Sequence, residues 1–224
     1  MDIAPRQIRR PRPAAAPATT TTSTSTPPSP PNPMRIAIAH KQTPVEKIRK
    51  RYPGGCTIVD VTSKAEMPWR KLSPFWPHGG FEVPTEKGRV GESVEGVWQG
   101  LKVFTNEGPD TSRLHITDLT NLKRGRSARR GDVLGHALTF APPASESPPL
   151  MDYVTARKRV YLPLYAQQLA RVDEEVEELR RLSMEGTLVL LDFGTNGTVE
   201  DLSKPLSHAA LIKAFLEDRY PACE

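Results

Sequence analysis

The chain has 224 residues, of which 37% are hydrophobic and 6% aromatic, and a formal net charge of +5. This length allows one globular domain with a sizeable core, and no apolar run approaches the ~20 residues that a membrane-spanning helix needs. The two cysteines, Cys56 and Cys223, lie too far apart for a disulfide framework or a metal-ligand spacing. A reducing, cytoplasmic setting is therefore expected.

The first 33 residues consist mostly of Pro, Ala, Thr and Ser. They show no hydrophobic pattern that could offset the entropy lost on ordering, so the sequence predicts a disordered tail at 1–33. Its arginine-rich start resembles a transit peptide, but it lacks the apolar core of a secretory signal and its prolines oppose an amphipathic helix. Residues 34–224 are predicted to form a single globular domain.

The start of that domain predicts a strand, a helix and a second strand. Residues 35–39 and 56–62 are β-branched and apolar, as strands are. Between them, Thr43 followed by proline is typical of a helix start, and Pro53 with two glycines ends the helix. A strand–helix–strand connection favours parallel pairing of the two strands.

Next in the chain come a loop and a short helix. Residues 67–91 are rich in Pro, Gly and Trp and predict a long structured loop of the kind that carries function. Residues 93–104 predict a helix, in which Gly96 and Gly100 form a strip where another backbone could come close. One face of that helix would carry Glu95, Trp98, Gln99 and Lys102, which recur at helical spacing.

The second half of the chain predicts more helix than strand. In order, it predicts a helical or turn segment at 118–121, a basic run at 123–130, a linker at 142–149, helix over 152–183, a buried strand at 187–193, a turn at 194–197 and an amphipathic helix at 207–216. Pro163 predicts a kink in the long helix or its division into two. The sequence therefore predicts an α+β fold, with several helices packed around a small sheet.

Common catalytic and cofactor motifs do not occur in this sequence. It contains no Walker phosphate loop, dinucleotide fingerprint, nucleophile elbow or His-Glu-x-x-His helix. The five histidines lie far apart without ligand spacing, so neither a metal nor a cofactor is expected.

Two neighbouring motifs resemble those of the NADAR family. Leu72-Ser-Pro-Phe-Trp-Pro77 is similar to the family pattern Leu-Ser-Asn-Phe-aromatic-Pro. Ser93 to Lys102 is similar to Ser-Val-Glu-His-aromatic-aromatic-Gln-x-x-Lys. The departures are Pro74 in place of the loop asparagine, and Gly96 and Val97 in place of the histidine and the first aromatic residue. The resemblance covers residues 70–104 well and the remainder loosely.

The resemblance implies an N-glycosidase that hydrolyses the N-glycosidic bond of a ribosyl-phosphate or ADP-ribosyl compound, in some members on nucleic acid. Glu95 would stabilise the oxocarbenium-like transition state or act as base for the water. Asp192 or Asp201 would supply a second carboxylate that protonates the leaving group. The substrate-binding positions would be Phe75, Trp76, Trp98, Gln99, Lys102, Arg126 and Arg130, with an indole stacking on the base and the cations pairing with phosphate.

A non-catalytic module that binds nucleotide or nucleic acid is the alternative. It is favoured by the incomplete motif and by the basic residues of the tail and loops. Each proposed site residue also has a purely structural interpretation: Glu95 pairs with Gln99 or a cation, Trp98 belongs to the core, and Lys102 is a solvated charge.

Overall fold

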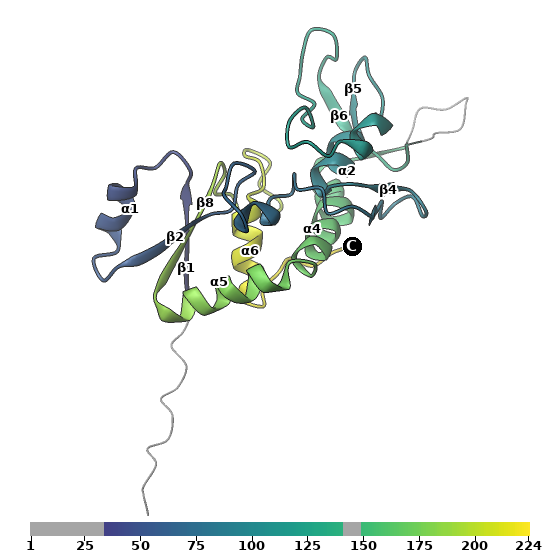
Figure 1. Ribbon diagram of the computed structural model, residues 1–224. Helices are drawn as coiled ribbons and strands as arrows, with labels where there is room; N and C mark the ends of the chain where they lie inside the picture. The colour runs from purple at the N-terminus through teal and green to yellow at the C-terminus, as the bar shows by residue number, and fades with distance from the viewer. Residues whose placement is uncertain (1–33, 141–148) are drawn as a thin grey trace, which may run out of the picture. The chain divides into compact units, whose positions relative to one another are not determined.

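The computed structural model describes residues 34–140 and 149–224 (Figure 1). The tail predicted at 1–33 and nearly all of the linker predicted at 142–149 lie outside the described residues. The described part combines helices with three small sheets, so the predicted α+β class is confirmed. None of its helices is both long enough and apolar enough to cross a bilayer.

A three-stranded parallel sheet contains the first two predicted strands. β1 (Arg35–His40) and β2 (Cys56–Asp60) both pair with β8 (Thr187–Asp192), in the order β1-β8-β2. The predicted direct pairing of the first two strands is therefore wrong. β8 is an apolar run whose last five residues are all buried, and a strand buried on both faces takes the central position of a parallel sheet.

Helices pack on both faces of this sheet. α1 (Val45–Arg51) connects β1 to β2, and its Ile48 packs with Val189 and Leu191 of β8. α5 (Asp173–Glu185) and α6 (His208–Leu216) lie against β1 and β8 on the side opposite α1 (Figure 1). The predicted buried strand at 187–193 and the closing helix at 207–216 are thus confirmed, to within a residue at their ends.

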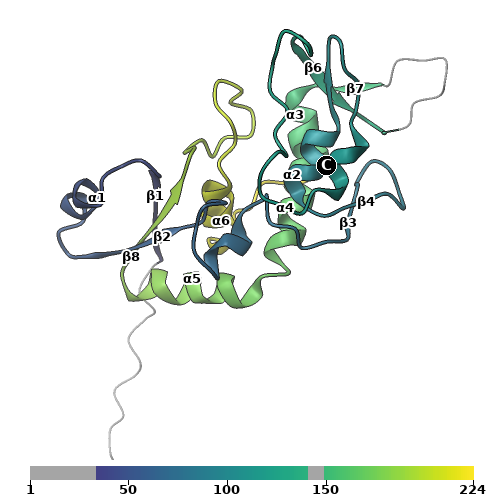
Figure 2. The same cartoon turned by 45° about the horizontal axis from the view of Figure 1, so that its top comes forward.

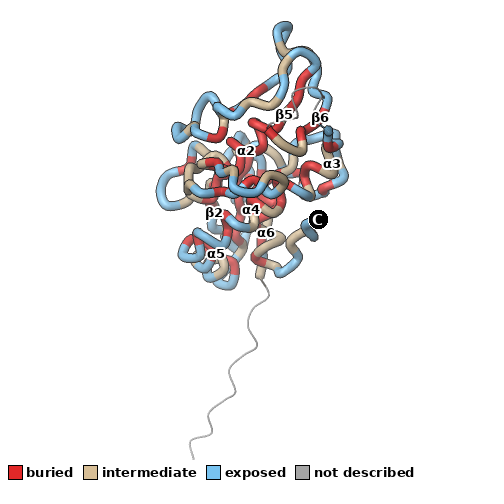
Figure 3. The backbone as a smooth tube through the Cα atoms, turned by 90° about the vertical axis from the view of Figure 1, so that its right-hand side faces the viewer, coloured by how far each residue is buried: buried red, intermediate tan, exposed pale blue. Residues whose placement is uncertain are grey.

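The middle of the chain is built around one short helix, α2 (Val94–Gly100), which is buried at every residue (Figure 3). The elements around it are the 3₁₀ turns η1 (Trp69–Leu72) and η2 (Thr111–His115), the hairpin β3 (Phe81–Glu82) and β4 (Val90–Gly91), and the antiparallel sheet of β5 (Lys102–Phe104), β6 (Val133–Ala137) and β7 (Leu150–Met151). The predicted helix over 93–104 is too long. Lys102 starts β5 and pairs across to β6, so it leaves the helical face where it was expected.

The long helical segment is divided at a different place from the one predicted. α3 (Tyr153–Ala156), the π-helical turn η3 (Arg157–Tyr161) and α4 (Leu162–Leu169) follow one another without interruption (Figure 2). Pro163 lies in the first turn of α4, directly after the π turn, so its missing N–H falls where the helical hydrogen-bond pattern changes. The break falls instead between α4 and α5, at 170–172.

Candidate functional site

A cavity of about 730 Å³ lies where the carboxyl ends of β2 and β8 meet α2 and the α3–η3 helix. Open parallel sheets bind their ligands outside the carboxyl ends of the strands, and this volume is in the range of small-molecule sites. Side chains from both parts of the fold line it. From the sheet and α6 these are Lys64, Asp192, Phe193 and His208. From the middle of the chain and the α3–η3 helix they are Phe75, Glu95, Trp98, Gln99, Lys102, Lys123, Tyr153, Arg157 and Tyr161.

The first turn of α2 is fixed by its cap and by the loop before it. Ser93 Oγ accepts a hydrogen bond from the backbone N–H of Gly96 at 3.0 Å, as an N-cap does. The N–H of Glu95 donates to the carbonyl of Pro74 at 2.9 Å. A Cβ on Gly96 would lie 2.7 Å from the carbonyl oxygen of Arg113. The expected close approach of another backbone to this glycine is therefore present, and a larger residue does not fit.

The carboxylate of Glu95 is buried and oriented within this cavity. The side chain is 7% exposed, and Gln99 Nε2 donates a hydrogen bond to its Oε1 at 2.7 Å. Gln99 Oε1 in turn accepts from the backbone N–H of Arg124 at 2.8 Å, which fixes the orientation of the amide. Oε2 of Glu95 accepts no hydrogen bond from the described residues, so one oxygen remains available to a ligand.

Aromatic rings form one wall of the cavity. The Trp98 ring meets Tyr153 edge-on at a centroid distance of 5.4 Å and Tyr161 at 5.5 Å. Trp98 also packs on His136, with the ring centroids 3.8 Å apart. Burial raises the pKa of both tyrosines, so their hydroxyl groups stay protonated at neutral pH. The wall can therefore pack against a planar group and donate hydrogen bonds from the two hydroxyls.

Lys102 and Phe75 are two further predicted residues that line the cavity. Burial lowers the pKa of Lys102, while the nearby charge of Glu95 opposes that shift. Among the described residues Lys102 makes no ion pair. Phe75 is half-buried, and the Lys123 ammonium lies 5.4 Å from its ring centroid.

The carboxylate of Asp192 already interacts with neighbouring residues of the protein. Its Oδ2 accepts from Ser207 Oγ at 2.7 Å and from the N–H of Ala209 at 3.3 Å, and lies 3.1 Å from His208 Nδ1. Burial alone would raise the pKa of Asp192, but the charge and hydrogen bond of His208 hold it well below its usual value. His208 Nε2 is 2.8 Å from the carbonyl of Val61. An ionised carboxylate held in this way has no proton to give, which favours a positioning role over the predicted acid.

Four predicted residues do not line the cavity: Trp76, Asp201, Arg126 and Arg130. The carboxylate of Asp201 accepts from Ser203. Arg126 pairs with Asp132 at 2.9 Å, and Arg130 pairs with Glu107 at 3.2 Å. The structure therefore brings together Glu95, Trp98, Gln99, Lys102, Phe75 and Asp192 and leaves these four outside.

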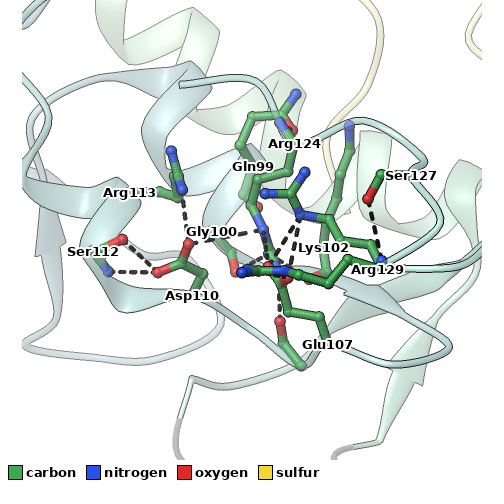
Figure 4. Close-up of polar contacts among 12 residues, drawn as sticks. Gln99, Gly100, Lys102, Glu107, Asp110, Ser112, Arg113, Arg124, Ser127 and Arg129 are labelled. Carbon is green, nitrogen blue, oxygen red and sulfur yellow. Dashed lines mark hydrogen bonds and ion pairs between the residues drawn. The ribbon is translucent and has the colours of Figure 1, made fainter. Parts of the chain in front are cut away.

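A buried arginine fastens the end of α2 (Figure 4). Arg124 Nη1 donates to the carbonyls of Gln99 at 3.1 Å and Lys102 at 2.8 Å. Its Nη2 donates to Glu107 at 2.7 Å and to the carbonyl of Gly108 at 2.7 Å. The hydrogen bond of Arg124, with those of neighbouring arginines, lowers the pKa of Glu107 to about 2. Arg124 thus positions Gln99 and Lys102 and is not available to bind phosphate.

Three residues on the α3–η3 helix were missed as site residues by the sequence analysis. Tyr153, Arg157 and Tyr161 all line the cavity. Their spacing of four residues is a signal that they share one side of a helix. The π-helical turn, which is common at functional sites, keeps Tyr161 on the same side.

No metal site accompanies this cavity in the part of the chain that the structure covers, since no three His, Cys, Asp or Glu side chains gather there. The class that these features define is a mixed α+β protein with a ligand-sized cavity at the carboxyl edge of a small parallel sheet. The chain matches the family of unknown function DUF6939 over residues 40–212, and it belongs to that family. No curated protein matches it. Neither finding links the chain to the NADAR family, so the resemblance over residues 70–104 stays a prediction.

Proposed function

We propose that this protein is an N-glycosidase of the NADAR-like type, which hydrolyses the N-glycosidic bond of a ribosyl-phosphate or ADP-ribosyl compound in the cytoplasm. The observation that carries the proposal is Glu95. Its carboxylate is buried at the cavity and is held by Gln99 through one oxygen, and the other oxygen accepts no hydrogen bond from residues 34–140 and 149–224. Both cysteines are free thiols, in keeping with a reducing compartment.

The reaction needs a negative charge close to the sugar. As the bond between the anomeric carbon and the base nitrogen breaks, its electron pair leaves with the base and positive charge develops on the ribose. The Glu95 carboxylate would stabilise that charge, or accept a proton from the water that bonds to the anomeric carbon. The low-dielectric surroundings of Glu95 strengthen the interaction relative to water.

The remaining lining residues suit the two ends of such a substrate. Trp98, Tyr153 and Tyr161 form a wall against which a planar base could pack, and the tyrosine hydroxyls could donate to the departing nitrogen. Lys102, whose ammonium has no carboxylate partner in the described part of the chain, would meet the phosphate.

The substitution Glu95→Gln tests the proposal. The wild-type protein, Glu95→Gln and the control Glu92→Gln would be incubated with a panel of ribosyl-phosphate and ADP-ribosyl N-glycosides, and the released base would be quantified by chromatography. Glu92 is three residues away and does not line the cavity. We expect Glu95→Gln to lose roughly 10²-fold or more in rate, and Glu92→Gln to retain it. A folded Glu95→Gln variant with the wild-type rate would refute the assignment.

A nucleotide- or nucleic-acid-binding module without catalysis is the second candidate. The ion pair between Asp192 and His208 favours this candidate. It leaves Glu95 as the one carboxylate that a ligand can contact among the described residues lining the cavity, so no second carboxylate is available as an acid. This module would bind its ligand without releasing base. Affinity for nucleic acid that falls steeply with salt, with no base released from any compound of the panel, would identify it.

A further inference from the structure

Arg157 is a buried cation that lines the cavity without a carboxylate partner. Its side chain is 2% exposed, and in the described part of the chain it forms no ion pair. A buried charge is costly unless it is paired or fully hydrogen-bonded. Burial lowers the pKa of Arg157, but an arginine stays protonated in a protein. The site therefore holds a permanent positive charge with no carboxylate at ion-pair distance among the described residues, and only the more distant charges of Asp201 and Glu200 offset it.

Backbone carbonyls fix the position of this guanidinium. Its Nη1 donates to the carbonyls of Val199 at 2.6 Å and Asp201 at 2.8 Å, and its Nη2 donates to the carbonyl of Lys204 at 2.9 Å. The guanidinium lies over the Tyr153 ring, with Cζ 5.3 Å from the centroid. The side chain is thus held in place before any ligand arrives, which lowers the entropic cost of binding.

Two donors of Arg157 remain without an acceptor among the described residues. A guanidinium has five N–H groups, and three are used by the carbonyls. The Nε–H and one hydrogen of Nη2 are left. These neighbouring nitrogens can bind two oxygens of one phosphate at once, the bidentate geometry for which arginine is selected.

The charges around the cavity favour an anionic ligand. Its lining includes the cations Lys64, Lys102, Lys123 and Arg157 and the carboxylates Glu95 and Asp192. Asp192 is already balanced by His208, whose pKa it raises against the effect of burial. The lining therefore carries an excess of positive charge, and a neutral ligand would leave that excess in place.

We infer that Arg157 is the phosphate-binding residue of the cavity and that Lys102 contributes the second positive charge. The ligand class is a sugar phosphate, bound through a monoester or diphosphate group. This assignment takes the place of the role predicted for Arg126 and Arg130. It rests on the proposed function for the sugar, whereas binding of the phosphate is independent of hydrolysis.

Calorimetric titration with ribose 5-phosphate and with ribose tests the inference. The proteins would be the wild type, Arg157→Gln and the control Arg159→Gln, which removes an exposed arginine two residues along the same π turn. We expect the wild type and Arg159→Gln to bind ribose 5-phosphate at least tenfold more tightly than ribose. Arg157→Gln should lose that preference while its weak affinity for ribose is unchanged. Equal preference in Arg157→Gln and wild type, or none in the wild type, would overturn the inference.

Arg157 also holds the segment at 199–204, so the variant could fail to fold. A measurement on the wild-type protein decides the question in that case: the NMR signal of the Arg157 Nε–H should shift when inorganic phosphate is added. No shift, at phosphate concentrations that displace ribose 5-phosphate, would overturn the inference. Binding of phosphate through Arg157 without release of base in any assay would refute the proposed function and leave this inference standing. Base release that Arg157→Gln leaves unchanged would remove the inference alone.

Discussion

Replacing Asp192 by asparagine keeps the shape of the side chain and removes the negative charge that pairs with His208. In the wild type this carboxylate is 4% exposed and meets Ser207, His208 and the N–H of Ala209 within 2.7 to 3.3 Å. Breaking a buried ion pair by removing one partner costs about 3–5 kcal/mol when the remaining group stays charged. His208 can release its proton instead, so this cost is an upper limit here. At roughly 2–4 °C per kcal/mol for a protein of this size, the melting temperature should fall by up to roughly 6–20 °C.

Urea unfolding followed by circular dichroism at pH 6 would measure this loss, since His208 is charged at that pH. The matched control is Asp201→Asn, because among the described residues the Asp201 carboxylate accepts only from Ser203, and it does not line the cavity. We expect a much smaller change for the control. A loss below about 1 kcal/mol in Asp192→Asn, which is the size of an ordinary hydrogen bond, would refute the ion pair as the reason for this arrangement.

Two further predictions concern stability. Since Asp192 raises the pKa of His208 above its ordinary 6.5, the folded protein binds a proton that the unfolded chain has released. The stabilisation is therefore complete below about pH 6.5 and is lost as the pH rises through the folded pKa, at no more than about 1.4 kcal/mol per pH unit. Unfolding free energies between pH 6 and 9 should show this slope in the wild type but not in His208→Gln, and an equal slope in both would contradict it. Gly96→Ala should cost about 1–3 kcal/mol in denaturant unfolding, because its Cβ would lie 2.7 Å from the carbonyl of Arg113. Gly125→Ala, where nothing lies within 4 Å, is the control, and equal stability of both variants would refute the clash.

Local sequence patterns predicted individual elements well and their neighbours poorly. The apolar, β-branched runs at 35–39, 56–62 and 187–193 all form strands, because strand formation depends on residue types close in sequence. The local patterns do not show that the third run, β8, lies between β1 and β2 in the sheet. The choice depends on which strand can be buried on both faces, and this is a property of the complete sheet and its helices.

The candidate site was predicted to a similar extent and for a similar reason. Helical spacing placed Glu95, Trp98 and Gln99 together correctly, because their relation is local. Arg126 and Arg130 were assigned by charge alone. In the structure they pair with the carboxylates of Asp132 and Glu107, and a count of charges along the sequence does not reveal such pairs. A basic run near a site in sequence is therefore a weak guide to the cations that line it.

The position of the cavity depends both on local elements and on the order of strands in the parallel sheet. Glu95 reaches it from a helix whose buried glycines let neighbouring segments pack against it, whereas Asp192 reaches it from the end of a strand that joins the sheet last in sequence. The α3–η3 helix then closes the space with Arg157, whose three carbonyl partners lie after that same strand. The three parts meet only when β8 occupies the centre of the sheet. Loss of that pairing would therefore separate Glu95 from Arg157 even if every local element still formed.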